Sequence, residues 1–450
     1  MRFATSLCLA LLSVANHASA ESWSDLSYLL RDPNSRAISI NRPLYDPADG
    51  MVWIVMDRLN ATGREVLVAS GEKGTDQWLE PVSLEKPSTP CFQSPRSAFS
   101  SLGDLIVTCR GATTVNNSVY SYVRSGVSGK WSPLLALLKT TDVFRNVEVI
   151  ATPDGRFAHV LDPMVAGKTT VRSLFYDPRT NSITVPEQLS PNNLPVVAPT
   201  FLANKDQTAL YLAYAVTEGS AATRGIYIHS YDRYAHRWSP ARWIRGSGNI
   251  QLTSVGPATK LVGAVDHHGY LTLVWEGNAV GGGFSVFSSR VPTDGACTTS
   301  QLTAPSPVRF ADLETFASLT PNDRGDLMLA MSRYERNQSH VITVRFYWGF
   351  GWGTPQVAAT SPMNLLGRTR VTFLPSGHGL LTFLGMQDGI RQITSLASEN
   401  DQWSANLLDI PDRYDGWMQQ LETIGDKALL VFTASKDEHE GGVVATWFKP

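Results

Sequence analysis

The chain has 450 residues, of which 43% are hydrophobic, and its 38 basic and 40 acidic side chains leave a net charge of −2. This balance, with no long block of either sign, argues against a general nucleic-acid binder and against a protein that binds anionic membranes. The 35 glycines, 26 prolines and 12 tryptophans, with few long runs of strong helix formers, predict an all-β chain.

Residues 1–20 have the pattern of a secretory signal peptide, which is removed from the mature protein. An early Arg2 precedes an apolar run, and small residues end the segment at Ala18-Ser19-Ala20. No later segment approaches roughly 18 uninterrupted apolar residues, so no transmembrane helix is predicted. We expect cleavage after Ala20 and a secreted or periplasmic mature chain that forms one domain over residues 21–450.

Three cysteines remain after that cleavage: Cys91, Cys109 and Cys297. Export to an oxidising compartment permits disulfides. Cys91 and Cys109 flank one predicted turn on neighbouring strands, so we predict that these two are bridged. Cys297 is then a lone, buried thiol.

A repeated pattern runs through the whole chain: a short strand, a polar turn, a tryptophan and then an apolar strand. Examples are SYVRSGVSGKWSPLLAL at 121–137 and SYDRYAHRWSPARWI at 230–244. The tryptophan position recurs at Trp23, Trp78, Trp131, Ile183, Trp238, Cys297, Trp352 and Trp403. These spacings of 51 to 59 residues lie in the range of propeller blades.

Upstream of each copy lies a turn that contains Gly or Asp and is followed by an apolar strand, as in TPDGRFAHVL and DHHGYLTLVW. Each unit therefore contains four short strands, and the chain predicts an eight-bladed β-propeller. Seven blades remain an alternative if the third or fifth unit is spurious, and an open solenoid or paired sandwiches are further alternatives.

The two ends of the chain predict how the ring closes. The last unit, over 427–448, stops after its third strand, and SWSDLSYLL at 22–30 supplies the missing outer strand. Such closure removes the exposed sheet edges that an open array would leave.

A propeller has two unlike faces, and we expect function at the upper mouth of the channel, where each inner strand begins and each second strand ends. The predicted starts of the inner strands carry the cations Arg42, Arg96, Arg145, Lys260, Arg368 and Arg370. A planar guanidinium at a fixed strand end is a good receptor for carboxylate or sulfate. These six residues are therefore the candidate ligand-binding set.

Carboxylates lie among these cations at the predicted ends of the second strands. Asp57, Glu276 and Glu335 are the catalytic candidates, because carboxyl groups with displaced pKa values serve as general acids or bases. The alternative is that these charges pair with one another and with loop carbonyls to hold neighbouring blades together.

Several of the turns resemble the Asp boxes of BNR-repeat propellers, of which sialidases are the best-known enzymes. SGEKGTDQW at 70–78 is similar to S-x-D-x-G-x-T-W with Glu72 in the Asp place, and SYDRYAHRW keeps Ser230, Asp232 and Trp238. NRPLYDPADGMVWIVMDR also resembles the first sialidase strand, through Arg42. The resemblance implies a propeller fold and carbohydrate chemistry.

The chain departs from the sialidases in two ways. Sialidases are six-bladed, and their mechanism needs three convergent arginines, an acid/base Asp and a Tyr activated by a Glu. Arg42 matches the first arginine, and no position assigns the other two.

Other chemistry has little support in the sequence. His267-His268 lies in a predicted turn of the lower face, and His159 alternates into a strand as a packed side chain. There is no zinc-type CxxC spacing, no P-loop and no G-x-S-x-G elbow, so no metal or cofactor is predicted.

Three classes of function remain. The first is a lectin-like protein that binds acidic glycans, to which Trp243, Trp275 and Trp417 would offer stacking faces. The second is a carbohydrate-active enzyme, either a sialidase-like glycosidase or a polysaccharide lyase. The third is a protein-interaction scaffold of the cell envelope. Pockets between blades would favour the lectin, and a fully ion-paired upper face would favour the scaffold.

Overall fold

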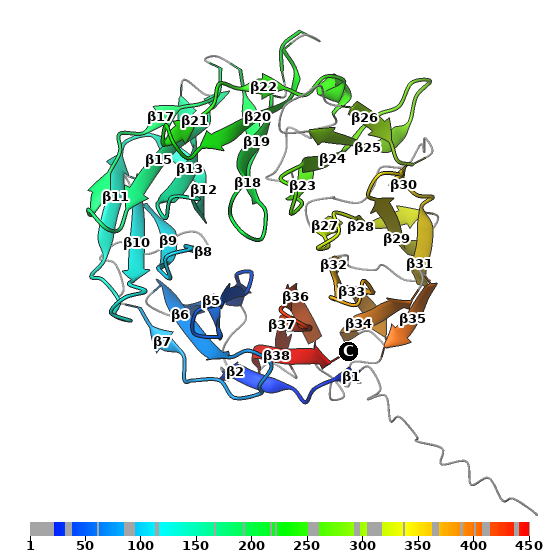
Figure 1. The fold of residues 1–450 in the computed structure, drawn as a ribbon, viewed down its shortest axis with the longest axis horizontal. Helices are drawn as coiled ribbons and strands as arrows, with labels where there is room; N and C mark the ends of the chain where they lie inside the picture. Colours follow the sequence, from blue (N-terminus) through cyan, green and yellow to red (C-terminus); the bar gives the residue numbers. More distant parts are fainter. Residues whose placement is uncertain are drawn as a thin grey trace, which may run out of the picture.

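The computed structural model describes residues 22–31, 38–60, 63–84, 95–112, 117–165, 168–191, 194–216, 218–220, 223–250, 261–291, 298–303, 317–335, 338–361, 369–387, 390–399, 402–406, 415–435 and 441–449. These residues form eight antiparallel sheets arranged as the blades of a closed ring (Figure 1). The predicted eight-bladed propeller is thereby confirmed. The predicted signal peptide, Cys91 and Cys297 lie outside the described residues.

The first four blades follow one another along the chain. Blade 1 contains β3 (Ile38–Ile40), β4 (Leu44–Asp46), β5 (Met51–Asn60), β6 (Gly63–Glu72) and β7 (Val82–Ser83). Blade 2 contains β8 (Arg96–Phe99), β9 (Leu105–Ala112), β10 (Asn117–Arg124) and β11 (Leu135–Thr140). Blade 3 contains β12 (Val143–Ala151), β13 (Phe157–Val165), β14 (Lys168–Thr169), β15 (Arg172–Asp177), β16 (Ser182–Ile183) and β17 (Glu187–Gln188). Blade 4 contains β18 (Val196–Ala203), β19 (Leu210–Val216), β20 (Gly225–Asp232), β21 (Arg237–Trp238) and β22 (Arg242–Trp243).

The other four blades complete the ring after the short 3-10 helix η1 (Ser247–Asn249). Blade 5 contains β23 (Leu261–Val265), β24 (Leu271–Asn278), β25 (Phe284–Val291) and β26 (Thr298–Gln301). Blade 6 contains β27 (Ala317–Pro321), β28 (Leu327–Glu335), β29 (Gln338–Tyr347), β30 (Gly351–Trp352) and β31 (Gln356–Ser361). Blade 7 contains β32 (Arg370–Phe373), β33 (Gly379–Gln387), β34 (Ile390–Glu399) and β35 (Gln402–Asn406). Blade 8 contains β36 (Asp415–Ile424), β37 (Lys427–Ser435) and β38 (Gly441–Lys449), with β1 (Ser22–Trp23) and β2 (Ser27–Arg31).

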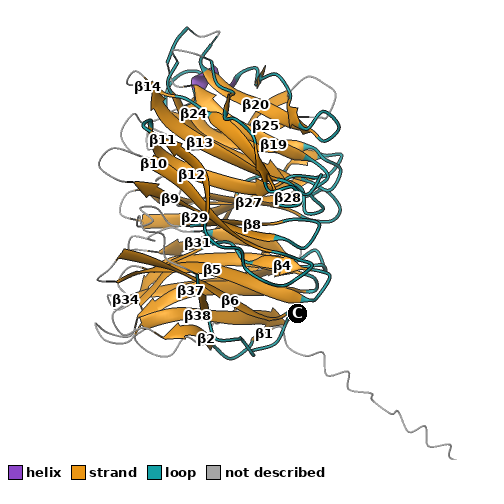
Figure 2. Cartoon of the chain, turned by 90° about the vertical axis from the view of Figure 1, so that its left-hand side faces the viewer, coloured by secondary structure: helices purple, strands orange, loops and turns teal. Residues whose placement is uncertain are grey.

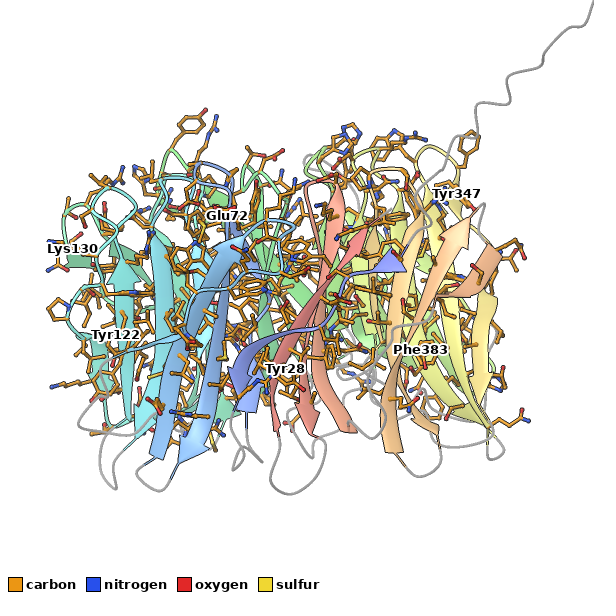
Figure 3. The ribbon with its side chains drawn as sticks, turned by 90° about the horizontal axis from the view of Figure 1, so that it is seen from below. Tyr28, Glu72, Tyr122, Lys130, Tyr347 and Phe383 are labelled. Atoms are coloured by element: carbon orange, nitrogen blue, oxygen red, sulfur yellow. The ribbon has the colours of Figure 1, made fainter. Side chains whose placement is uncertain are left out.

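The first strand of each blade lies nearest the ring axis, and the strands alternate in direction outward from it (Figure 1). The turns from first to second strand and from third to fourth strand therefore share one face, which we call the lower face. It lies on the right in Figure 2. Glu72 and Tyr347, beside the third-to-fourth turns of blades 1 and 6, lie toward the same end of the ring in Figure 3.

Residues with positive φ close the turns of the lower face. A glycine takes this conformation in the first-to-second turn of most blades, for example Gly103 (φ 87°) and Gly155 (φ 82°), because it has no Cβ to oppose it. In blade 4 the same turn uses Gln207 (φ 54°). Asn181 and His236 do so in the third-to-fourth turns of blades 3 and 4. The Gly/Asp turns that the sequence predicted are therefore confirmed as the links between strands.

The repeated tryptophan begins the fourth strand of a blade. Trp131 pairs with Arg124 of its third strand, Trp238 with Tyr231, and Trp403 with Ser398. Ile183 takes the same place in blade 3, opposite Tyr176. The predicted repeat therefore marks one structural position.

The ring closes as predicted, with the N-terminal strand in the last blade. β1 pairs with β38, so that Trp23 lies opposite Phe448 and their rings meet edge to face at 5.2 Å. Trp447, which is fully buried, donates from Nε1 to the Thr75 carbonyl of blade 1 at 2.8 Å. The N-terminal strands thus complete blade 8, and the hydrogen bond from Trp447 joins that blade to blade 1.

Apolar side chains on alternate strand positions fill the spaces between adjacent blades, as the period of two requires. Between blades 8 and 1, Ile54 and Leu67 pack with Leu429 and Trp447. Among the described residues no helix is long and apolar enough to cross a membrane.

Candidate functional site

Three of the predicted arginines occupy one level of the ring's inner wall. Each of them lies four residues before the residue whose carbonyl accepts the hydrogen bond that closes the first-to-second turn. These carbonyls belong to Asp46, Ser100 and Leu374, for Arg42, Arg96 and Arg370 respectively. They belong to blades 1, 2 and 7. Blades 7, 8, 1 and 2 are consecutive around the ring (Figure 1), so the three arginines lie in neighbouring parts of its inner wall. We call Arg42, Arg96 and Arg370 the cationic arc.

Carboxylates from neighbouring inner strands meet two of these arginines. Arg42 pairs with Glu422 of blade 8 through both guanidinium Nε and Nη2. Arg96 Nε lies 2.8 Å from Glu148 Oε1 of blade 3. Glu422 raises the pKa of Arg42, because a nearby negative charge stabilises the charged guanidinium.

The arc is open to solvent even though it lies on the inner wall of the ring. The Arg42 side chain is 73% exposed, and that of Arg96 is 33% exposed. Arg370 is half-buried, and its Nη1 donates to the Thr369 carbonyl at 3.0 Å. A guanidinium carries five N–H donors, so one bidentate carboxylate leaves Arg42 with donors that face water.

Blade 8 contributes an amide at the same level. Gln420 lies four residues before Ile424, where the tight turn of blade 8 begins, and its Nε2 donates to the Ile40 carbonyl of blade 1 at 3.3 Å. The sequence analysis missed Gln420, Glu148 and Glu422. Counting back from the first residue of each turn, rather than from its glycine, would have found Gln420 and Glu148.

The other predicted cations and one carboxylate remain predictions. Arg145 lies on β12 and Glu335 on β28, but their side chains fall outside the described part of the structure. Lys260 and Arg368 lie outside the described residues altogether. The same holds for Cys91, so its bridge to the buried Cys109 on β9 also stays a prediction.

Two of the catalytic candidates are closed to solvent. Asp57 is fully buried between Arg64 and the Ser39 hydroxyl, and burial raises its pKa while the Arg64 charge opposes that rise. Glu276 on β24 is fully buried as well. A general acid or base must reach its substrate, so this burial favours a structural role for both carboxylates.

Buried polar groups also join neighbouring blades at other second-strand positions. Arg110 of blade 2 donates from Nη1 to the Phe144 carbonyl of blade 3 at 2.5 Å, and within blade 3 Asp162 accepts from the backbone N–H of Asn146 at 2.6 Å. Burial lowers the pKa of Arg110 in blade 2, and the Asp162 charge partly offsets this. The histidine predicted to be packed, His159, is fully buried with Nε2 3.1 Å from the Thr108 hydroxyl.

The three predicted stacking tryptophans differ in exposure. Trp275 is fully buried and donates to Asn249 Oδ1 at 3.1 Å. Trp243 is 36% exposed and donates to the Arg224 carbonyl. The Trp417 side chain lies outside the described set. Of the two that are described, Trp243 alone offers a ring to a ligand.

No group of three or more His, Cys, Asp or Glu side chains that could hold a metal ion occurs among the residues that the structure describes.

Comparison with known proteins adds little to this geometry. No family model matches the chain, and no curated protein matches it. Among solved structures it is similar to a fungal alcohol oxidase of the AA5 family in complex with copper, with 11% identity, a TM-score of 0.49, and coverage of 96% of this chain and 76% of that chain. It is also similar to a PL25 ulvan lyase, with 10% identity, a TM-score of 0.47, and coverage of 85% and 97%.

A third similar structure is a mutant of the NanB sialidase from Streptococcus pneumoniae, with 11% identity and a TM-score of 0.39. The similarity covers 96% of this chain and 93% of that chain. Likeness at this level assigns no activity to this chain.

Proposed function

We propose that this protein is an exported lectin-like propeller that binds acidic carbohydrate at the cationic arc of its channel. The observation that carries the proposal is the common level of Arg42, Arg96 and Arg370 on the inner wall, in blades 1, 2 and 7 respectively. Such a row offers planar, bidentate donors at intervals along one wall. Acidic glycans carry carboxylate or sulfate groups at intervals along a chain, and these are the groups that a guanidinium recognises best.

The exposure of the arc supports binding rather than a purely structural role. An exposed ion pair adds little to stability, and Arg42 keeps 73% of its side chain in solvent, where a ligand can reach it. Glu422 and Glu148 hold the guanidinium groups in place, so less side-chain freedom is lost when a ligand binds.

The charge of the chain favours a glycan over a nucleic acid. Nucleic-acid binding needs a broad basic surface that neutralises many phosphates. Here the net charge is −2, and carboxylates lie beside two of the three arginines of the arc. A carbohydrate with spaced acidic groups fits this alternation better than a continuous polyanion.

The buried carboxylates favour binding of the carbohydrate without its cleavage. Asp57 and Glu276 are both fully buried, so neither is placed to protonate a glycosidic oxygen. A sialidase-like glycosidase or a lyase is the alternative, and it would need catalytic groups other than Asp57 and Glu276.

The proposal is tested with a glycan array and the mature protein, beside two variants and one matched control. Arg42→Gln and Arg370→Gln remove cations of the arc. Arg179→Gln removes a cation with the same kind of partner, because Arg179 is 54% exposed and pairs with Asp177 on the lower face, away from the inner strands.

We expect binding to uronate-containing or sulfated glycans that weakens with salt, falls at least tenfold in both arc variants, and is unchanged in Arg179→Gln. Binding that is equal in all four proteins would move the site away from the arc. The absence of binding to any acidic glycan would overturn the proposal, and release of shorter products from a bound glycan would favour the enzyme.

A further inference from the structure

The blades spread apart toward the outer rim, and between blades 3 and 4 the space is left open. A cavity of about 470 Å³ lies there, beside β17 and β21, which are neighbours at the rim in Figure 1. Glu187, Gln188 and Leu189 of blade 3 form one wall. The other wall comes from blade 4 and consists of His229, Asp232, Arg237, Trp238, Ser239, Pro240 and Ala241.

The local sequence explains why the second wall is hollow. Blade 4 has a fourth strand that is split into β21 and β22, and Ser239, Pro240 and Ala241 form the connection between them. Pro240 has no N–H to give to the third strand, so regular pairing stops there. Ser239 holds the connection close to β20, because its N–H donates to the Ser230 carbonyl at 2.8 Å.

The floor of the cavity is rigid. His229 is 3% exposed, its Nδ1 donates to the Ser239 carbonyl at 2.7 Å, and its Nε2 lies 3.3 Å from the Tyr214 hydroxyl. The Tyr214 ring stacks on Tyr227 at 5.8 Å, and its hydroxyl also lies 3.3 Å from the Leu189 carbonyl of blade 3. This chain of contacts ties the two walls together.

Trp238 fixes the lower part of the cavity in the same way. Its Nε1 donates across the blade interface to Ser173 Oγ at 3.0 Å, and its ring stacks between Phe175 of blade 3 and Phe201 of blade 4. The cavity is therefore already formed before a ligand enters, which lowers the ordering cost of binding. Its volume lies within the usual range for small-molecule sites.

The lining chemistry differs from that of the cationic arc. Two carboxylates, Glu187 and Asp232, face one guanidinium, Arg237, so the charge of the lining is negative. Backbone N–H groups of Ala235 and Tyr234 hold the pKa of Asp232 below its ordinary value, so this carboxylate stays ionised at neutral pH. An acidic sugar is therefore repelled here.

Neutral hydroxyl groups fit the lining instead. A hydroxyl both donates and accepts, so it can donate to Glu187 or Asp232 and accept from the amide of Gln188 or from Arg237. Leu189, Pro240 and Ala241 add apolar surface, against which the C–H face of a sugar ring can pack. We infer that the cavity between blades 3 and 4 is a separate binding site for a neutral sugar unit.

This inference depends on the proposed carbohydrate function only in general class, because it concerns another part of the ring. It adds a neutral-sugar site at the rim to the acidic-sugar site of the channel. A glycan with both kinds of unit would be held at two points, which raises the overall affinity when both can be engaged at once.

The experiment blocks the cavity by placing a large side chain on one of its walls. Ala241 is exposed on the cavity side, so Ala241→Trp blocks the space without disturbing a buried core position. Ala235→Trp is the matched control, because Ala235 is exposed in the neighbouring turn and does not line the cavity. Gln188→Trp, from the opposite wall, is a second blocking variant in case Ala241→Trp does not fold.

The probes are neutral monosaccharides and disaccharides, with methyl glucuronate as the acidic counterpart, and binding is followed by saturation-transfer NMR and calorimetry. We expect at least one neutral sugar to bind in the millimolar range to the wild type, Ala235→Trp and Arg42→Gln. Its affinity should fall at least tenfold in the folded blocking variant.

Two results would overturn the inference. One is that no neutral sugar of the panel binds the wild type, and the other is that binding survives in both blocking variants. If neutral-sugar binding fails while methyl glucuronate still binds in a manner that depends on Arg42, only the rim site is lost. If the reverse holds, the rim site stands and the channel proposal fails.

Discussion

The lower rim, by which we mean the turns of the lower face, encloses its charged side chains, whereas the channel wall leaves side chains of the same types exposed to solvent. On the rim, Asp266 is fully buried and pairs with Arg290, whose side chain is 18% exposed. The Arg290 guanidinium lies 4.9 Å from the ring centre of Tyr270 and 4.7 Å from that of Trp348. On the channel wall, Arg42 also pairs with a carboxylate, but its side chain is 73% exposed.

A second rim cluster has the same character. Asp154 accepts hydrogen bonds from Thr152, Arg156, His236 and Tyr231 between blades 3 and 4. Burial raises the pKa of Asp154, but these donors and the Arg156 charge outweigh it and hold the pKa below its ordinary value. The aromatic and hydrogen-bonding surroundings, rather than the ion pair itself, therefore separate a structural charge from one that is available to a ligand.

The largest expected effect comes from breaking the enclosed pair. Asp266→Ala removes the counter-charge of Arg290 and the acceptor of the Tyr270 N–H, so we expect a loss of about 3 kcal/mol in the free energy of unfolding. Glu148→Ala breaks an open pair in the channel and should cost about 0.5 kcal/mol. Urea unfolding of both variants measures the difference, and equal losses would contradict the contrast between rim and wall.

The interior between the rim and the wall contains a neutral histidine that makes stability depend on pH. Burial lowers the pKa of His159 to about 3, against 6.5 for an unperturbed histidine. Below pH 6.5 the unfolded chain therefore binds a proton that the folded chain does not, and stability falls as the pH decreases. At about 1.4 kcal/mol per pH unit, we expect a loss of about 2 to 3 kcal/mol between pH 6.5 and 4.5.

His159→Gln checks the source of that slope. The amide does not titrate, so the variant should lack this part of the pH dependence, whatever its stability at pH 8. Urea midpoints measured from pH 8 to 4.5 give both slopes. A slope as steep in the variant as in the wild type would place the acid sensitivity in other groups, such as Asp154, whose lowered pKa also removes stability as the pH falls.

We expect the contacts that close the ring to make an intermediate contribution to the free energy of unfolding. Trp23→Ala removes the edge-to-face contact with Phe448 and the hydrogen bond from Nε1 to Ser395 Oγ at 3.2 Å, so we expect a loss of about 2 kcal/mol. Trp243→Ala is the control, because Trp243 is 36% exposed on a fourth strand that does not close the ring. It should cost less than about 1 kcal/mol in thermal or urea unfolding. A larger loss in the control would mean that closure adds no special stability.

The fold could be predicted because each blade repeats its turn chemistry locally. The tryptophan turns and the Gly/Asp turns recur in register, and even blade 3, with Ile183 in the tryptophan place, keeps matching flanks. Blade 4 turns through Gln207 without a glycine, and the neighbouring copies fix its position. Closure by Trp23 was predictable because the last unit visibly lacks a strand.

The ion pairing and the burial of the candidate site residues could not be predicted in the same way. Arg42 and Glu422 are 380 residues apart in the chain, and Arg96 and Glu148 are 52 residues apart. Their pairing depends on which blades become neighbours and on the level of each strand. The burial of Asp57 likewise depends on Arg64 and Ser39 closing around it, which a position at a strand end does not reveal.

The smallest expected effect on stability is also the most informative about the channel. Arg42→Gln breaks the pair with Glu422, but the guanidinium is 73% exposed, so the loss should stay below about 1 kcal/mol at low salt and vanish in about 1 M salt, where charges are screened. The same substitution should reduce binding of acidic glycans at least tenfold. A stability loss as large as that of Asp266→Ala would place Arg42 with the structural charges of the rim, because an arginine that holds two blades together cannot also be released to a ligand without cost to the fold.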